Sequence, residues 1–574
     1  MNRSTFKQRL LALALGAACL ASTAVFAQDA AVAPAPIDLP DAGPVEIKPQ
    51  DSGLPADWDH GVFVEILVRA YQDSDGDGIG DINGLISRLD YLKELGVTGI
   101  WLMPVFKSAD HDHGYAVVNY RDIEPQYGTL ADFDRLLAEA HKRGIGIIVD
   151  YVMNHSSAEH PAFEDAYDKR RTSRYKDWYI FSNKEMTGWT AYSGDPWREA
   201  GPNRWYYAVF DTGMPDFNLR NPEVVDFHMN NLKFWLNRGV DGFRFDAVGV
   251  LYENSSVAWE NQPENHVLMK QVQDLLAQYG KRYMVCEAPS DPAAFSGVDS
   301  CGSAFAFGIQ KHIIKSIKMG RLMPDLLYNL RTLPVERMGT ILANHDYFAG
   351  ARIYDQFKGD LASYRLATGT LMTLPGRPFI YYGEEIGLSH AEPVQQDDQS
   401  IRAPMSWSNE PHAGFTTSDT PFRPSAANWE TFNVAAESGK ADSLLSWYES
   451  LIALRKSQPA LQYGSFKPLS KDDDQIFAFV REYQGSKLLV LINYAYREGK
   501  IDLPPDFKAA DWQPLLPAAA ALDVSVKAPP KPVAKPKKGK AKVEALGAQE
   551  PVFVPGTQEL KMPAQTMMVF KATN

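Results

Sequence analysis

The chain has 574 residues, too many for one hydrophobic core, so two or three domains are expected. Its 71 acidic and 58 basic side chains leave a formal net charge of −13, which argues against binding to nucleic acid or to an anionic membrane surface. Hydrophobic residues make up 45% of the chain and aromatic residues 11%, as in globular proteins. Beyond the N-terminal region, no stretch is long and apolar enough to be a transmembrane candidate.

The first 27 residues have the pattern of a secretory signal peptide. The basic start contains Arg3, Lys7 and Arg9. An apolar run follows at residues 10–24, with a cleavage site ending in Ala27. Cleavage there changes the formal net charge from −13 to −16, because three positive charges are removed. Cys19 lies in the apolar run, but the residues before it fit a lipoprotein signal poorly. We therefore expect a free protein, periplasmic or secreted.

Residues 28–55 are rich in alanine, proline and aspartate without periodicity, which predicts a linker. An apolar strand is predicted at residues 62–68. The loop after this strand carries carboxylates with glycines between them, at Asp73, Asp75, Asp77 and Asp81. Such a loop suits a hard cation that prefers oxygen ligands.

The acidic loop begins like an EF-hand loop, but its twelfth position is Gly84 instead of the bidentate glutamate. We therefore expect a structural calcium site of another kind, to which Ile79 contributes its backbone oxygen. The alternative is a solvated acidic turn.

Helical and strand patterns then alternate. Helices are predicted at residues 86–95 and 130–143, and strands at residues 99–103 and 145–151. The alternation predicts a parallel sheet with helices outside it. It stops at residues 156–222, where tryptophan, tyrosine and turn residues dominate; this segment is too long for an ordinary loop and predicts an inserted subdomain. Its aromatic side chains offer faces for sugar rings.

The alternating pattern resumes at residue 223 and continues to residue 459. Further strands are predicted at residues 240–246, 283–287, 339–343 and 377–382, and a last helix at residues 443–455. Residues 460–574 contain short β-rich runs and predict a separate antiparallel β domain. Within it, residues 527–549 predict a disordered insert rich in lysine and proline.

Polar side chains gather where the predicted strands end. They are Asp150, His155, Arg244, Asp246, Glu287, His345 and Asp346. Three acids on three strand ends can converge at the mouth of a parallel barrel. Glycoside hydrolysis needs two carboxyls, one ionised and one protonated, on either side of the scissile bond. The alternative for the Arg244–Asp246 pair is a purely structural ion pair.

Local surroundings distinguish the two acids. The positive charge of Arg244 favours the ionised form of Asp246. Apolar neighbours are expected to raise the pKa of Glu287, which suits a general acid. Cys286 and Cys301 can pair in an oxidising compartment, but Cys286 lies in an apolar strand, where a buried free thiol is more usual.

From about residue 62 to its end the chain resembles the α-amylase superfamily of glycoside hydrolases. Four ordered motifs carry the resemblance, at residues 150–155, 242–248, 285–288 and 342–346. The resemblance implies an α/β fold: a (β/α)8 TIM barrel (residues 56–155 and 223–459), an inserted domain B (residues 156–222) and a C-terminal antiparallel β domain.

The resemblance also implies roles for individual residues. Asp246 would be the nucleophile, Glu287 the acid/base and Asp346 the transition-state stabiliser. The sugar would be contacted by Arg244, His155 and His345 and stacked on Tyr115, and Asp150 would be structural. The loop from Asp73 to Asp81 looks like the calcium loop of oligosaccharide-cleaving members.

Within the superfamily the motifs are mixed. Residues 214–218 are similar to the domain B segment of members that are intermediate between glucosidases and neopullulanases. Trehalose synthases are instead resembled by residues 252–253, 260–264 and 402–407. Glucosidases carry an aspartate where this chain has Ala116. They also carry an arginine where it has Ala349, with Arg352 as the nearest candidate. Loss of that carboxylate–arginine pair favours an open cleft and internal cleavage.

The sequence therefore predicts a monomeric, retaining α-amylase-type hydrolase of α-1,4-linked glucans and maltooligosaccharides. The alternatives are an α-glucosidase or a maltose-rearranging trehalose synthase. A third, from another class, is a catalytically dead glucan-binding protein, which the intact trio of acids disfavours. Chain-length preference, the choice between α-1,4 and α-1,6 bonds, and the balance of hydrolysis and transfer stay open.

Overall fold

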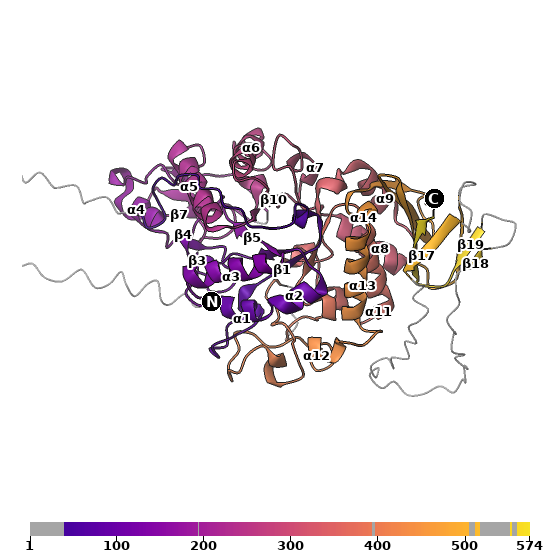
Figure 1. Cartoon of the computed structure of the whole chain (residues 1–574). Coiled ribbons are helices and arrows are strands. Elements are labelled where there is room, and N and C mark those ends of the chain that lie inside the picture. The colour runs from indigo at the N-terminus through magenta and orange to yellow at the C-terminus, as the bar shows by residue number, and fades with distance from the viewer. Residues whose placement is uncertain are drawn as a thin grey trace, which may run out of the picture. The chain divides into compact units, whose positions relative to one another are not determined.

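The computed structural model describes residues 39–192, 194–392, 397–503, 511–516, 552–553 and 559–573 (Figure 1). The predicted signal peptide at residues 1–27 and the predicted insert at residues 527–549 lie outside these ranges. In the ranges given, no helix has the length and apolar character needed to cross a membrane.

Seven parallel strands form the central sheet, as the alternating pattern predicts. In spatial order they are β10 (Tyr283–Cys286), β9 (Gly242–Phe245), β5 (Gly146–Tyr151), β2 (Gly99–Leu102), β1 (Phe63–Ile66), β12 (Arg377–Tyr381) and β11 (Gly339–Thr340). The gap between β10 and β11 is bridged by single parallel pairings, Cys286 with Ala304 and Phe305 with Gly339. The sheet thus closes almost completely into a barrel, and the predicted fold class is confirmed.

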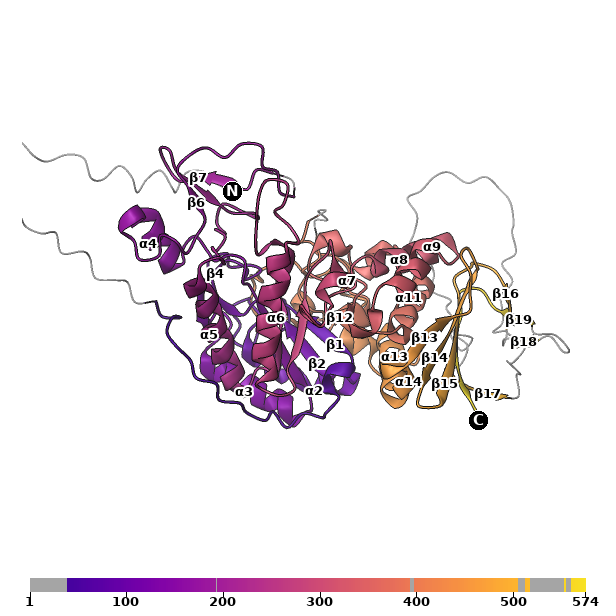
Figure 2. The same ribbon diagram turned by 90° about the horizontal axis from the view of Figure 1, so that it is seen from above.

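Helices cover the outside of the barrel. They are α1 (Ile82–Ser87), α2 (Leu89–Leu95), α3 (Leu130–Lys142), α5 (Pro222–Arg238), α6 (Pro263–Ala277), α8 (Ile309–Met319), α11 (Leu361–Thr373) and α13 (Leu444–Ser457) (Figure 2). Shorter helices are α7 (Pro292–Phe295), α9 (Pro324–Thr332), α10 (Ile353–Gln356) and α12 (Val434–Glu437). The single helix predicted at residues 86–95 is wrong, because Arg88 interrupts it between α1 and α2.

Large aromatic side chains fill the inside of the barrel. Trp58, Phe63, Trp101, Tyr283, Phe305 and Phe379 belong to one buried cluster there. Glycines on the neighbouring strands make room for them. A Cβ on Gly99 would lie 2.3 Å from the ring of Phe63, and a Cβ on Gly146 would lie 2.3 Å from the ring of Trp58. The rings therefore close the N-terminal end of the barrel and leave the chemistry to the strands' C-terminal ends.

Irregular segments and small antiparallel sheets rise above the C-terminal strand ends. One hairpin pairs β3 (Phe106–Ser108) with β4 (Val117–Ile123). The segment after β5 contains α4 (Pro161–Lys169) and a sheet of β6 (Phe181–Ser182), β8 (Trp205–Tyr207) and β7 (Trp197–Glu199). Half of the aromatic residues of this segment are buried, among them Trp178, Tyr179, Tyr206 and Tyr207.

The C-terminal part is an antiparallel β structure. Its larger sheet contains β13 (Ser465–Pro468), β14 (Ile476–Tyr483), β15 (Ser486–Asn493), β20 (Met567–Ala572) and β17 (Trp512–Leu516). A smaller sheet contains β16 (Gly499–Asp502), β19 (Glu559–Met562) and β18 (Val552–Phe553). The larger sheet contacts the barrel through α14 (Pro459–Tyr463) and α11.

Residues 39–48 form an N-terminal strap that runs along β4 and α5. The buried carboxylate of Asp41 accepts a hydrogen bond from the backbone N–H of Tyr120 (2.9 Å), and its Oδ2 lies 3.3 Å from Nε2 of the buried His160. Arg121 donates to the backbone oxygens of Ala42 (3.0 Å) and Gly43 (2.8 Å). The strap is thus bound by a buried charge as well as by backbone contacts.

We predict that Asp41→Ala lowers the free energy of unfolding by about 1–3 kcal/mol, because it leaves the Tyr120 N–H and His160 buried without their partner. Urea denaturation followed by fluorescence measures the change. The matched control is Asp51→Ala, since Asp51 is exposed and its Oδ1 accepts a bond from nearby Gly53. Equal stability of the two variants would show that the buried carboxylate contributes nothing.

Candidate active site

The structure brings the predicted site residues together at the C-terminal ends of four strands. Arg244 lies on β9, and Asp246 follows that strand directly. Glu287 follows β10. His345 and Asp346 lie beyond β11, and Tyr115 comes from the loop between β3 and β4. Parallel register explains part of this arrangement, because Asp150 on β5 is the direct neighbour of Arg244.

The guanidinium of Arg244 lies at the centre of three carboxylates. Its Nη1 is 2.7 Å from Oδ1 of Asp246 and 2.8 Å from Oδ1 of Asp150. Its Nη2 is 2.7 Å from Oε2 of Glu287. Arg244 is buried, and a buried charge is tolerated where it is paired and hydrogen-bonded. One side chain therefore fixes the relative positions of the predicted nucleophile and the predicted acid/base.

Asp150 is held entirely inside the protein. Besides Arg244, it accepts hydrogen bonds from the hydroxyl of Tyr115 (2.9 Å) and from the indole N–H of Trp101 (3.2 Å). Burial raises the pKa of Asp150 to about 7, although Arg244 opposes the shift. Asp150 thus orients two groups that face the site, the Arg244 guanidinium and the Tyr115 ring.

Glu287 has the environment of a proton donor. Burial raises its pKa, the neighbouring Asp246 carboxylate raises it further, and Arg244 opposes the shift. Both carboxyls contact one guanidinium, because Oδ1 of Asp246 lies beside Nη1 of Arg244 and Oε2 of Glu287 lies beside its Nη2. The two acids therefore face the same small volume at the mouth of the barrel.

A second group of polar side chains surrounds Asp346. Nδ1 of His345 lies 2.5 Å from Oε1 of Glu65, and its Nε2 lies 2.9 Å from the Tyr115 hydroxyl and 3.2 Å from Oδ2 of Asp346. Nη2 of Arg402 lies 3.5 Å from Oδ1 of Asp346. Burial lowers the pKa of His345 well below its ordinary value, so the imidazole is neutral near pH 7.

His155 has a free hydrogen-bonding group. The side chain is buried, and its Nε2 has no hydrogen-bond partner in the part of the chain that the structure describes. Burial lowers its pKa to about 3, so the ring is neutral near pH 7. The ring of Phe210 lies 5.2 Å from that of His155. A neutral, unpartnered ring nitrogen is available to a polar ligand.

Some residues of the site were missed at the level of sequence. Glu65 is the one charged residue of the strand predicted at residues 62–68, and a charge in an apolar strand was an available signal. In the sequence, Arg402 stands out only as part of the motif at residues 402–407. Phe210 and Trp259 lie in loops, where no periodic pattern indicates which side chains face the site.

Comparison with known proteins decides the family. The model of the α-amylase catalytic domain matches residues 65–464. The chain belongs to the α-amylase family. It is 33% identical to "Trehalose synthase/amylase TreS" of Mycolicibacterium smegmatis over 75% of this chain and 82% of that protein. It is 31% identical to an "Oligo-1,6-glucosidase" of Parageobacillus thermoglucosidasius over 78% of this chain and 92% of that protein.

A solved structure gives the same assignment. The α-amylase from H. orenii is 30% identical, superposes with a TM-score of 0.72 and covers 90% of this chain and 99% of its own. The relatives thus include enzymes named for different reactions. Family membership shows an enzyme that acts on glucosidic bonds, and the particular reaction must come from the site.

The acidic loop of this α-amylase-family protein gathers three carboxylates. Oxygens of Asp73, Asp75 and Asp81 lie within 4.8 Å of one another, whereas Asp77 is not part of this group. Burial raises the pKa of Asp75, and the nearby negative charges of Asp77, Asp81 and Asp73 raise it further. A cation would relieve this repulsion, and oxygen donors suit a hard metal ion. The residues present therefore fit a metal ion.

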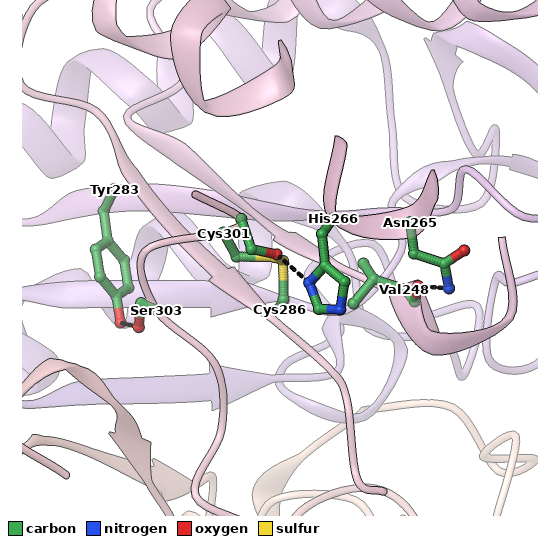
Figure 3. Close-up of a disulfide and its surroundings, with 8 residues drawn as sticks. Val248, Asn265, His266, Tyr283, Cys286, Cys301 and Ser303 are labelled. Carbon is green, nitrogen blue, oxygen red and sulfur yellow. Dashed lines mark hydrogen bonds between the residues drawn. A yellow bond between two sulfur atoms is a disulfide. The ribbon is translucent and has the colours of Figure 1, made fainter. Parts of the chain in front are cut away.

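Cys286 and Cys301 form a disulfide (Figure 3). The expectation of a free thiol at Cys286 is therefore wrong, because the chain returns beside β10 and Cys286 donates its N–H to the Ser303 oxygen (3.0 Å). Next to the disulfide, Nδ1 of His266 lies 2.9 Å from Oγ of Ser300. The bridge thus ties the segment around Cys301 to Cys286, the residue that precedes Glu287.

Arg352 does not reach the site in this family member. Its guanidinium is buried, donates to the backbone oxygen of Ile401 (2.8 Å) and lies 3.9 Å from the centre of the Tyr381 ring. It therefore cannot take the place of the arginine that glucosidases carry at the position of Ala349. The loop that carries Ala116 has another pair, because Nη2 of Arg423 lies 2.9 Å from Oδ1 of Asp112.

Proposed function

We propose that this protein is an exported, retaining α-glucan hydrolase that cleaves α-1,4 bonds inside maltooligosaccharides. The observation that carries the proposal is the buried Arg244 guanidinium in contact with both Asp246 and Glu287. Two carboxyls that share one guanidinium, of which Glu287 has a raised pKa, supply the nucleophile and the proton donor that double displacement requires.

In the first step, an oxygen of Asp246 attacks the anomeric carbon while Glu287 protonates the departing glycosidic oxygen. The carbon–oxygen bond to the leaving sugar breaks, and a glycosyl–Asp246 ester forms. In the second step, Glu287 takes a proton from water, the water oxygen attacks the same carbon, and the ester bond breaks. Two inversions retain the anomeric configuration.

The surrounding residues would bind the sugar that carries the reacting carbon. Asp346, beside neutral His345, would act as the transition-state stabiliser; burial and the charge of Glu287 raise its pKa, and Arg402 and Arg244 oppose the shift. Nε2 of His155 is available to a sugar hydroxyl. Tyr115, fixed by Asp150, offers its ring as a stacking face.

A maltose-rearranging trehalose synthase is the second candidate. Residues 260–264 and 402–407 resemble such enzymes, and Arg402 lies beside Asp346. One relative bears a name that covers both trehalose synthase and amylase. This reaction would form the same glycosyl–Asp246 ester, but the glucosyl group would then be transferred to a hydroxyl of glucose instead of to water.

Export is part of the proposal. The basic and apolar N-terminal pattern supports cleavage near Ala27. The Cys286–Cys301 disulfide is consistent with an oxidising compartment such as the periplasm or the extracellular space.

We predict that Asp246→Asn reduces turnover of maltooligosaccharides by at least about 10³-fold, because an amide cannot form the ester. Glu287→Gln should lose about 10²–10⁴-fold on the same substrates, because both the proton donor and the base that activates water are removed. It should still release about one equivalent of fluoride from α-glucosyl fluoride in the first turnover, since that leaving group needs no proton. For the wild type, kcat/KM should fall on the alkaline side as Glu287 loses its proton, with a midpoint above the ordinary glutamate value of 4.5.

Thermal unfolding of both variants controls for folding. An Asp246→Asn variant with wild-type activity would remove that residue from its role, and products of inverted configuration would rule out double displacement.

The acidic loop is proposed as a structural calcium site, with Asp73, Asp75 and Asp81 as the gathered ligands. Asp77 and the backbone oxygen of Ile79 are proposed as further ligands. Asp73 and Asp81 are pre-oriented by hydrogen bonds from Gly78 N (2.9 Å) and Gly84 N (2.8 Å). The loop follows β1 and contains no proposed catalytic residue, so calcium would act on stability.

We predict that calcium raises the melting temperature of the chelator-treated protein. An ion that binds only the folded state raises the free energy of unfolding by about 2.7 kcal/mol when its free concentration is 100 times its Kd. Asp75→Asn should reduce this response, because it removes one exposed ligand. Asp472→Asn, which removes an exposed carboxylate elsewhere, should keep it. Differential scanning calorimetry with and without calcium measures the shift, and an unchanged wild-type melting temperature would contradict the proposal.

Internal cleavage is inferred from what the site lacks. A terminal-glucose pocket must pair that sugar's distal hydroxyls, since an unpaired buried polar group costs about 1–3 kcal/mol. Ala116 and Ala349 offer no polar side chain, and Arg352 is buried elsewhere.

We predict that maltoheptaose labelled at its reducing end gives several short labelled fragments from the earliest times. Chromatography of products at under about 5% conversion measures this, before secondary cleavage obscures the pattern. Glucose and labelled maltohexaose as the main early products would instead indicate a closed pocket, with the Asp112–Arg423 pair as the residues that close it. Conversion of maltose into trehalose would favour the second candidate.

A further inference from the structure

The Cys286–Cys301 disulfide lies immediately beside the proposed acid/base. Cys286 is the last residue of β10, and Glu287 follows it directly. Both cysteines are buried, and the bond joins residues that are 15 positions apart in the chain (Figure 3). The disulfide contributes no atom to the proposed reaction, so its position next to Glu287 needs a separate explanation.

The end of β10 is held unequally on its two sides. Toward β9, the whole of β10 pairs in parallel register, and the N–H of Glu287 donates to the backbone oxygen of Phe245 (2.9 Å). On the other side, the described chain offers a single parallel pairing, of Cys286 with Ala304. The disulfide therefore adds a covalent link on the weaker side, at the gap in the barrel between β10 and β11.

The segment that carries Cys301 is itself fixed to neighbouring helices. Nδ1 of His266 on α6 lies 2.9 Å from Oγ of Ser300, and the centre of the His266 ring lies 4.2 Å from that of the Phe295 ring. The N–H of Cys301 donates to the backbone oxygen of Phe295 (3.1 Å), the last residue of α7. Cys286 is thus bonded to a segment that α6 and α7 anchor.

Helix α6 also contacts the loop of the proposed nucleophile. The side-chain amide of Asn265 donates to the backbone oxygens of Val248 (2.9 Å) and Gly249 (2.7 Å). Val248 lies two residues beyond Asp246, and its N–H donates to the backbone oxygen of Glu287 (3.1 Å). The disulfide and these hydrogen bonds therefore connect the loops of the two acids through one helix.

We propose that the Cys286–Cys301 disulfide positions the Glu287 carboxyl for proton transfer, so that the enzyme acquires full activity only after these two thiols are oxidised. The inference rests on the proposed function, because it concerns the same acid/base. Oxidation removes two electrons and two protons from the thiols, and a disulfide-bearing oxidant of an export compartment accepts them and is reduced to two thiols. Chains that stay in a reducing compartment would keep both thiols and a poorly placed acid.

Proton transfer is more sensitive to this link than nucleophilic attack. A general acid must lie within hydrogen-bond reach of the oxygen that it protonates, and it contributes about 10²–10⁴-fold to the rate. A displacement of about 1 Å can cost about 10²-fold. Asp246 instead follows β9, which is paired in register with β5 on one side and with β10 on the other. Loss of the disulfide should therefore affect Glu287 first.

The experiment compares three forms of the full-length protein: the oxidised wild type, Cys301→Ala, and wild type refolded from the unfolded state in a thiol reductant. Cleavage of maltoheptaose needs the proton of Glu287. First-turnover release of fluoride from α-glucosyl fluoride needs only the nucleophile, because fluoride leaves without a proton. Cys301→Ala keeps the Cys286 side chain beside Glu287. The control is Asp41→Ala, which removes a buried carboxylate of the N-terminal strap.

We predict that kcat on maltoheptaose falls about tenfold in Cys301→Ala and in the reduced wild type, because the acid is displaced. KM and the first-turnover rate of fluoride release should stay within about twofold of the oxidised wild type. Reoxidation of the reduced wild type should restore kcat. Asp41→Ala should match the wild type in both reactions at temperatures below its melting transition.

The pH dependence gives a second readout. Burial raises the pKa of Glu287, so a looser site that admits water should lower this pKa. The alkaline limb of kcat/KM should therefore move to lower pH in Cys301→Ala and stay in place in Asp41→Ala. Titratable groups that face Glu287 are unchanged in both variants; they are Arg244, Asp246, Asp346 and Tyr192.

Other results would overturn the inference. Wild-type kcat in Cys301→Ala and in the reduced protein would show that the disulfide does not position the acid, and would leave the proposed function standing. An equal fall in fluoride release, or failure of both forms to fold as judged by circular dichroism, would show a general structural role. Oxidised wild type that neither cleaves maltoheptaose nor releases fluoride would refute the proposed function, and the inference with it.

Discussion

The active site depends on one buried positive charge. Arg244 is desolvated, and its guanidinium is stable there because Asp150, Asp246 and Glu287 surround it. Without it, three buried carboxylates would face one another with no counter-charge. Parallel pairing of β5 with β9 and of β9 with β10 sets these groups side by side. The strand register therefore determines which charges lie next to one another in the active site.

The same arrangement separates the two acids chemically. Arg244 contacts both, but burial and the neighbouring Asp246 charge leave Glu287 with a raised pKa. Burial and the neighbouring Asp246 thus favour the protonated form of Glu287, and a proton donor at this position is what glycosyl transfer through an ester needs. Beside this centre, the polar side chains of His345 and Arg402 contact Asp346.

Family membership and reaction specificity reside in different parts of the molecule. The α-amylase family model matches residues 65–464, which hold the barrel strands and Asp246, Glu287 and Asp346 at their ends. Under the proposed mechanism, the loops around the strand ends would decide whether water or a sugar accepts the glycosyl group. Loops supported by a rigid barrel can change without disturbing the charges at its centre.

The sequence alone determined the order of the elements, the family and the positions of Asp246, Glu287 and Asp346 after their strands, because periodicity and short motifs are local signals. Tertiary structure decided the rest. The Cys286–Cys301 bond, the contact of Glu65 with His345 and the burial of Arg352 join segments that only barrel closure and loop packing bring together.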